Sequence, residues 1–287
     1  MVKTFTSRST GIILVIISAL VFSSAGIFTR AITAGAWDII FWRGLFAVCF
    51  TLVYTAWRRS FRPEFMLMGK SGLACAIVGA SGTAAYIPAF KFTTIANVSL
   101  IYAATPLIAA FLAWWWMGER ATKLVLVAGL VTLLGVAIVV SGSFGGFHLG
   151  GDLLACWMAL AMAIGFVIYR KYPATPAAGP SALSSLLLIP FALVLGTPLQ
   201  DSWPEIATMI AFGLVFAIAS ITLSEGAKRL PAGETSLLSI LEVPVAPLFA
   251  WLLFSEVPAG ASFVGGALIL AAVVASQVLV MPAKVAA

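Results

Sequence analysis

Ten stretches of about 20 mostly apolar residues follow one another along this chain, and only short connections separate them. A helix needs about 20 such residues to cross the hydrocarbon core of a bilayer. The stretches are Gly11–Ile32, Trp37–Trp57, Lys70–Phe90, Ala96–Met117, Lys123–Gly142, Asp152–Tyr169, Ser181–Leu199, Ile206–Leu223, Glu234–Phe254 and Ala259–Met281. Only 9% of the residues are charged, against about 25% in a soluble domain. The sequence therefore predicts an all-α membrane protein with ten transmembrane helices.

The basic residues are distributed unevenly over the connections. If the N-terminus is cytoplasmic and all ten stretches span, thirteen of the sixteen Lys and Arg residues fall on the cytoplasmic side. Arg30, Arg43 and Lys91 are the other three, toward the outer ends of the first three helices. Cytoplasmic loops carry an excess of Lys and Arg. This predicts cytoplasmic termini, and it explains the net charge of +6 without a nucleic-acid partner. The first stretch stays apolar to Ile32, which favours a spanning helix over a signal peptide.

Part of the fourth stretch is repeated in the ninth. Ala96–Glu119 and Gly233–Glu256 lie 137 positions apart and share six of 24 residues. Five spans in each half is an odd number, so the second half would insert upside down relative to the first. We expect two inverted five-helix repeats, residues 1–142 and 152–281, around a central cavity. Inverted repeats are a common basis for alternating access, which favours a transporter.

Polar residues three positions apart share one helix face in each copy. They are Ser99, Tyr102 and Thr105 in the first copy, and Ser236, Ser239 and Glu242 in the second. Pro106 follows the first stripe, and Pro244 and Pro247 follow the second. Proline removes a backbone donor and frees a carbonyl in mid-membrane, where it could hold a polar ligand. The alternative is a packing kink in which the hydroxyls bond their own helix.

Glu242 is the only acidic residue well inside a predicted span. A charge at that depth costs about 2.5–3.5 kcal/mol on the insertion scale. We therefore expect it to be paired, to face water, or to be protonated. It would serve as a counter-charge for a substrate ammonium or as a proton-coupling site; the alternative is a neutral acid that locks the kink.

Further candidates lie on other predicted helices. Arg43 is roughly 9 Å into the second helix at 1.5 Å per residue. Its guanidinium could clamp a carboxylate or pair internally with Asp38. Lys91 is a second cation near the outer side.

Aromatic side chains complete the candidate binding set. Tyr86, two residues before the predicted kink at Pro88, and Tyr102 each combine an apolar ring with a hydroxyl. Such side chains suit a cavity for a partly apolar solute. Trp157 is the third aromatic candidate, and core packing is the alternative for all three.

Catalytic and cofactor motifs are missing from the sequence. There is no GxxxxGK[ST] phosphate loop and no HExxH. Cys49, Cys75 and Cys156 all fall in apolar stretches, which favours packing over disulfides or metal ligation. We therefore expect no cofactor, no metal and no catalytic site.

Several motifs resemble one known family. They are FWRGLFA around Arg43, ANVSLIYAATPLIAAFLAWWWMGE over the fourth stretch, and its ninth-stretch counterpart, which ends Phe254-Ser255-Glu256 where the family has Gly-Glu. The whole chain resembles the EamA branch of the drug/metabolite transporter superfamily, and most closely the YddG-type exporters of bacterial inner membranes. The resemblance implies a basket of helices around a central cavity and export of aromatic or broader neutral amino acids.

The leading functional hypothesis is an inner-membrane amino-acid exporter working by alternating access. Its partners would be a small-molecule substrate and the lipid bilayer, and a monomer is compatible with the sequence. Export of another small metabolite or a cationic drug is an alternative. An intramembrane enzyme or a structural membrane protein is an alternative of a different class. A sugar phosphate is disfavoured, because only one clear intramembrane arginine is available for its charge.

Overall fold

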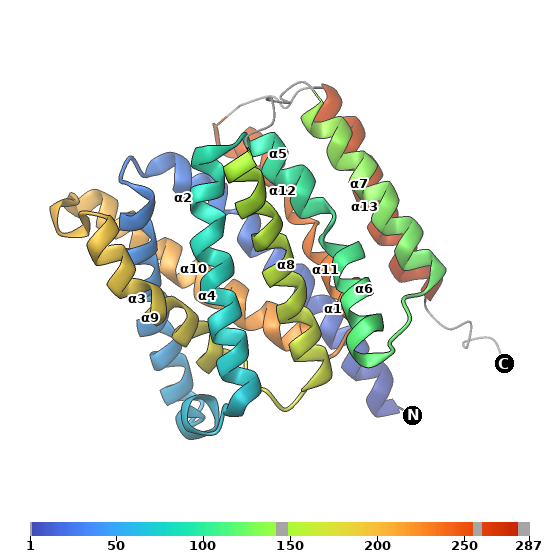
Figure 1. The fold of residues 1–287 in the computed structure, drawn as a ribbon, viewed down its shortest axis with the longest axis horizontal. Helices are drawn as coiled ribbons and strands as arrows, with labels where there is room; N and C mark the ends of the chain where they lie inside the picture. Colours follow the sequence, from blue (N-terminus) through green and yellow to red (C-terminus); the bar gives the residue numbers. More distant parts are fainter. Residues whose placement is uncertain (1, 142–148, 255–259, 281–287) are drawn as a thin grey trace.

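The chain folds into helices. The structure, a computed structural model, describes residues 2–141, 149–254 and 260–280, and every regular element within them is helical. The α-helices are α1 (Val2–Ser23), α2 (Ala25–Ala31), α3 (Ala36–Trp57), α4 (Gly69–Phe92), α5 (Ile95–Ala103), α6 (Thr105–Met117), α7 (Lys123–Val140), α8 (Leu149–Lys171), α9 (Ala178–Leu195), α10 (Trp203–Ala227), α11 (Ala232–Ser239), α12 (Glu242–Phe254) and α13 (Gly260–Val280) (Figure 1). Two short turns, η1 (Arg62–Met66) and η2 (Pro198–Gln200), lie in connections. The predicted all-α class is confirmed.

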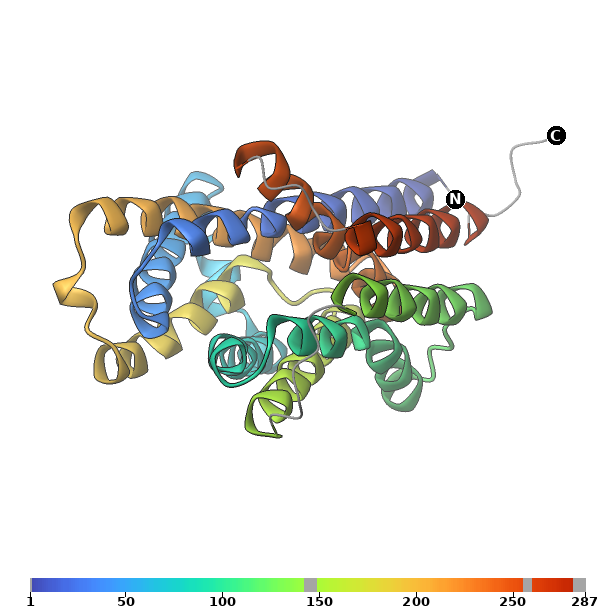
Figure 2. The same cartoon turned by 90° about the horizontal axis from the view of Figure 1, so that it is seen from above.

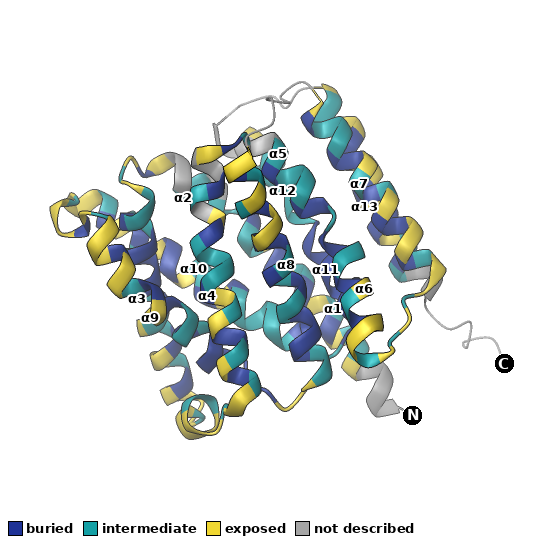
Figure 3. Cartoon of the chain, in the orientation of Figure 1, coloured by how far each residue is buried: buried dark blue, intermediate teal, exposed yellow. Residues whose placement is uncertain are grey.

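Eight helical stretches among the described residues are long and apolar enough to cross a membrane. They are Ala36–Trp57, Asn97–Met117, Lys123–Val140, Leu149–Lys171, Ala178–Leu195, Trp203–Ala227, Ala232–Phe249 and Gly260–Gln277. Ser7–Ser23 is a shorter apolar helix. Many large apolar side chains on these helices point outward, including Val194, which is 83% exposed (Figure 3). An exposed apolar surface of this extent fits lipid as the solvent, so the chain is a multi-pass helical membrane protein.

The helices lie in two layers. Seen from above, α1, α10 and α13 belong to one layer, and α4, α5 and α8 belong to the other (Figure 2). Within the layers α1 packs on α10, and α4 packs on α8. In the same way, α10 packs on α3, and α4 packs on α9. Three further contacts join the two halves of the chain: α3 with α9, α6 with α11, and α7 with α13. Apart from the α6–α11 pair, these contacts between helices keep the same pattern when the first and second halves of the chain are exchanged.

Polar contacts tie the connections together at the end that carries the N-terminus. They join Arg8 to Glu234, Arg170 to Glu119, and the Glu64 carboxylate to the backbone N–H groups of Ala178 and Gly179. These contacts bring together α1, the connections after α3 and α6, and the neighbouring ends of α8, α9 and α11.

A second set of polar contacts lies at the opposite end. The Asp38 carboxylate accepts from the N–H of Gly35 and of Thr197, at 3.1 and 2.6 Å. The Trp42 indole donates to Asp201 at 3.0 Å. Burial, and secondarily the nearby Asp38, raise the pKa of the Asp201 carboxyl above its ordinary value. Asp38 therefore fixes the start of α3 to the end of α9.

The first apolar stretch is not the single helix that the sequence predicts. It is divided at Ser24 into α1 and α2. The Ser23 hydroxyl donates to the Ala19 carbonyl at 2.7 Å, and the Ser24 hydroxyl donates to the Val21 carbonyl at 2.7 Å. Hydroxyls that bond back to the preceding turn compete with the helical ladder and bend it, which accounts for a break without proline.

Glycines set the separation of α7 and α13. A Cβ on Gly265 would lie 2.3 Å from the Gly135 carbonyl oxygen, whereas a Cβ on its neighbour Gly266 would meet only the Pro244 Cβ at 3.4 Å. Small residues at such crossings let helix backbones approach closely in a membrane.

We expect Gly265→Ala to separate α7 from α13 and to destabilise the protein. Overpacking of this kind costs about 1–3 kcal/mol, against a gain in helix propensity of up to about 1 kcal/mol. The melting temperature in detergent measures the effect. Gly266→Ala is the matched control, because its added methyl makes an ordinary contact. Equal melting temperatures for the two variants would contradict this account of the crossing.

Candidate functional site

The predicted helix over Ala96–Met117 is broken in its middle, between α5 and α6. Pro106 has no N–H to offer the Tyr102 carbonyl four residues earlier. The Thr105 hydroxyl donates to that carbonyl instead, at 2.5 Å. Thr105 is fully buried, so its hydroxyl mends the break and does not face open space.

The corresponding segment of the second half is broken between α11 and α12. Ile240 and Leu241 form a turn there, and Glu242 is the first residue of α12. The Val243 N–H donates to the Ile240 carbonyl at 2.9 Å, the carbonyl that Pro244 leaves without its helical donor. Ser239 is buried and donates to the Thr235 carbonyl of its own helix at 2.9 Å.

Three helix breaks converge on Glu242. The Tyr102 hydroxyl, from the end of α5, lies within hydrogen-bonding reach of the Glu242 carboxylate. At the break between α1 and α2, the Ser23 hydroxyl oxygen lies 3.5 Å from the Glu242 carbonyl oxygen. Glu242 itself is only half-buried. The carboxylate therefore meets the other half of the chain at the point where three helices are interrupted.

Tyr86 is a partly exposed phenol that lies near this carboxylate. It lies on α4 near Ala85 and Ala89, which are buried against α8 in the main core cluster. Tyr86 is nevertheless 43% exposed. It is also close enough to both Glu242 and Arg43 to interact electrostatically with each.

Arg43 is a buried cation that lies close enough to Tyr86 to interact with it electrostatically. Only 7% of the residue is exposed, and its guanidinium carbon lies 4.1 Å from the ring centroid of Phe216 and 5.5 Å from that of Phe212. The predicted alternative of an internal pair with Asp38 is wrong, because Asp38 accepts from backbone N–H groups at the helix ends. A buried charge without an ion pair is costly, which makes Arg43 a functional candidate.

The remaining candidates lie apart from this group or are not described in full. Trp157 lies on one face of α8 with Leu149 and Leu153, and all three are exposed. Ser99 is half-buried on α5. The side chains of Lys91 and Arg30, and the whole of Glu256, lie outside the described part of the chain.

Two of the predicted kinks are not helix breaks. Pro88 lies inside the continuous helix α4, and Pro247 lies inside the continuous helix α12. One proline removes one hydrogen bond, and the surrounding turns hold the helix together.

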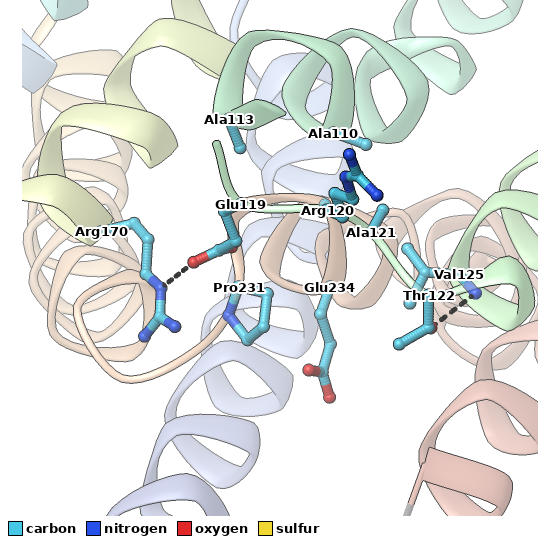
Figure 4. Close-up of a pocket in the computed structure, with 11 residues that line it drawn as sticks. Ala110, Ala113, Glu119, Arg120, Ala121, Thr122, Val125, Arg170, Pro231 and Glu234 are labelled. Carbon is cyan, nitrogen blue, oxygen red and sulfur yellow. Dashed lines mark hydrogen bonds and ion pairs between the residues drawn. The ribbon is translucent and has the colours of Figure 1, made fainter. Parts of the chain in front are cut away.

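Two small pockets lie at the ends of the molecule. One, of about 150 Å³, lies among the end of α6, the end of α8 and the start of α11, at the end that carries the N-terminus (Figure 4). Glu119 and Arg170, which line it, form an ion pair at 2.7 Å. The other, of about 370 Å³, lies between the start of α3 and the end of α9 and is lined by Asp38 and Thr197, which bond one another. Of the charged groups that line these pockets, Glu119 binds Arg170, Glu234 binds Arg8, and Asp38 binds backbone N–H groups.

Sequence reasoning missed three residues of the central group. Phe212 and Phe216 are four apart on α10 and so share the face that Arg43 stacks against. Their spacing was a signal, although in an apolar stretch it is indistinguishable from lipid-facing packing. Ser23 was missed because Ser23-Ser24 was not recognised as a helix break.

A family model confirms the class of protein. The model of the EamA-like transporter family matches twice, over residues 9–141 and 149–276. The chain belongs to the EamA-like transporter family. As an EamA-like transporter, it has a small-molecule substrate and works in a lipid environment, and family membership favours transport over an enzyme activity.

Individual relatives agree with this assignment. The chain is 28% identical over 232 residues to a Pseudomonas aeruginosa protein named "Uncharacterized transporter PA0485", covering 75% of this chain and 74% of the relative. A crystal structure of another protein superposes with a TM-score of 0.83 at 18% identity, covering 96% of this chain and 99% of that one. The second likeness supports the fold alone.

We expect Arg8→Gln to destabilise the protein by about 2 kcal/mol, because it leaves Glu234 without its cation. The Glu234 side chain is 3% exposed, whereas that of Arg8 is 27% exposed, so solvent moderates the loss. Thermal unfolding in detergent provides the measurement. Arg229→Gln is the control, because its pair with Glu225 is about 30% exposed on both sides and contributes well under 1 kcal/mol. The same loss in both variants would show that the Arg8–Glu234 pair is no more than a surface pair.

Proposed function

We propose that this EamA-like transporter exports amino acids, aromatic and other neutral ones, across the bacterial inner membrane. In the family this proposal places it with YddG-type exporters. The observation that carries it is the approach of Tyr102 to Glu242 where three helix breaks converge. An exposed phenol, Tyr86, lies beside this group. Together they offer polar contacts in mid-membrane next to apolar walls, as a partly apolar solute requires.

We further propose ten spans arranged as two inverted five-helix repeats, residues 1–142 and 152–281. In this scheme α1 with α2, and α4, add two spans to the eight that meet the length and hydropathy requirement. The exchange of packing partners between the halves supports the repeat. With the basic loops at the cytoplasmic side, both termini are cytoplasmic. Alternating access then arises when the two halves exchange conformations around a fixed site.

In the proposed site Glu242 receives the substrate ammonium. A carboxylate accepts hydrogen bonds from an ammonium group, and hydrogen bonds between charged groups are the strong ones. The Tyr102 hydroxyl holds the carboxylate in place, while Thr105 and Ser239 keep the two breaks in shape through their own backbones. Tyr86 contributes its hydroxyl and part of the wall.

A cationic drug or metabolite is the second candidate substrate. The half-buried Glu242 carboxylate favours it, because no described cation forms an ion pair with that group. The position of Arg43 near Tyr86 argues against a cationic substrate. A purely cationic ligand would leave the Arg43 charge unmatched.

We expect Glu242→Gln to lower amino-acid counterflow in proteoliposomes about 10- to 100-fold. The reason is the loss of a charge-assisted hydrogen bond, about 1.5–3 kcal/mol. Glu205→Gln is the control, because Glu205 bonds Thr33 at the opposite end of the molecule. Unchanged counterflow in Glu242→Gln would remove the carboxylate from the substrate site. Absence of saturable counterflow for all twenty amino acids in the native protein would end the amino-acid proposal.

A further inference from the structure

We propose that Arg43 binds the carboxylate of the transported molecule, which is therefore a dipolar ion lying with its ammonium toward Glu242 and its carboxylate toward Arg43. This inference rests on the proposed function, because it fixes the substrate's orientation in the same site. It adds an anion-binding pole on α3 and α10 to the carboxylate pole on α5 and α12.

The Arg43 guanidinium lacks acceptors. The side chain is 93% buried, since 7% of the residue is exposed. Within the described chain it donates no hydrogen bond, and its Nε is a buried donor without a partner. Buried polar groups in folded proteins are almost always bonded. A guanidinium left in this condition in mid-helix indicates that an acceptor arrives from outside the chain.

The surroundings of Arg43 present its donors without using them. Phe216 and Phe212 on α10 lie 4.1 and 5.5 Å from the guanidinium carbon. Aromatic rings stabilise a cation through its face, but they offer no acceptor in the plane of the N–H groups. The planar edge of a guanidinium matches the two coplanar oxygens of a carboxylate. The two rings therefore contact the cation without supplying an acceptor, so its N–H groups remain for a bidentate ligand.

The acidic residues nearest in sequence and space are engaged elsewhere. Asp38, five residues before Arg43, is bonded by the N–H groups of Gly35 and Thr197. Asp201 accepts from the Trp42 indole. Neither is available to neutralise Arg43.

The two charged groups, Arg43 and Glu242, both lie near the Tyr86 phenol. Tyr86 interacts electrostatically with Arg43 and with Glu242. A ligand with a positive group at one pole would still leave Arg43 unmatched, and a ligand with a negative group alone would leave Glu242 unmatched. A molecule with both groups matches both, and Phe212, Phe216 and Tyr86 provide apolar surface for its side chain.

The test is a competition series in proteoliposomes of the full chain, with labelled phenylalanine counterflow as the readout. The competitors are phenylalanine, phenylalanine amide, which has no carboxylate, and 3-phenylpropionate, which has no ammonium. We expect the native protein to prefer phenylalanine over the amide at least tenfold. In Arg43→Gln we expect this preference to disappear, because phenylalanine weakens and the amide does not. Arg58→Gln, a loop cation, should keep the native preference.

Two further variants keep the test decisive if Arg43→Gln does not fold. Arg43→Lys keeps the charge but loses the planar fork, and should show a reduced preference. Phe216→Leu removes the closer ring, and should weaken phenylalanine more than the amide. A preference for phenylalanine over the amide that is unchanged in all variants that fold would overturn the proposal, as would equal losses for both competitors.

A separate measurement distinguishes this inference from the proposed function. If the native protein carries no amino acid, the function fails, and the anion site is then tested by melting temperature with 3-phenylpropionate. Stabilisation in the native protein that is lost in Arg43→Gln would support a carboxylate site for another class of substrate. No stabilisation in the native protein would overturn the Arg43 proposal as well.

Discussion

A helix that stops inside a membrane exposes backbone groups that lipid cannot bond, and this constraint governs the centre of the molecule. The helices are interrupted at Ser24, between α5 and α6, and between α11 and α12. Serine hydroxyls, the Thr105 hydroxyl and a tightened backbone turn supply the missing partners. The interruptions converge near Glu242. Their repair is local, which leaves room between the halves for groups with other partners.

Charge is treated differently at the ends and in the centre. At the end that carries the N-terminus, Arg8, Arg170 and Lys228 each have a carboxylate partner, at 2.5, 2.7 and 2.6 Å. In the centre, Arg43 and Glu242 each lie near Tyr86 and make no ion pair with each other. Unmatched charges inside a bilayer are expensive. Structural ion pairs therefore account for charge at the ends, whereas the proposed charged ligand would match the groups in the centre.

The sequence predicted the parts of the fold that depend on composition and on proline. Apolar length locates the helices, and Pro106 and Pro244 mark two of the breaks, because a missing N–H acts at a fixed distance along the chain. The break at Ser24 was missed, since a serine pair bends a helix only where its hydroxyls turn back. Pro88 and Pro247 do not interrupt their helices, because the neighbouring turns hold a helix together around a single proline. Whether Arg43 is paired depends on the hydrogen-bond partners of the Asp38 carboxylate, which no local sequence pattern predicts.

The two broken segments also differ in a way that helps to explain the carboxylate. Thr105 and Glu242 are 137 residues apart, and each is the first residue of the helix after its break. The Thr105 hydroxyl donates to the Tyr102 carbonyl, which Pro106 leaves without its helical donor. At the second break the Val243 N–H bonds the equivalent carbonyl, at Ile240. The Glu242 side chain is therefore not needed to bond this carbonyl, and its carboxylate can reach Tyr102 in the first half of the chain. If the two breaks were once equivalent, a change from side-chain to backbone hydrogen bonding at the second break would leave a free polar side chain in only one of the two segments.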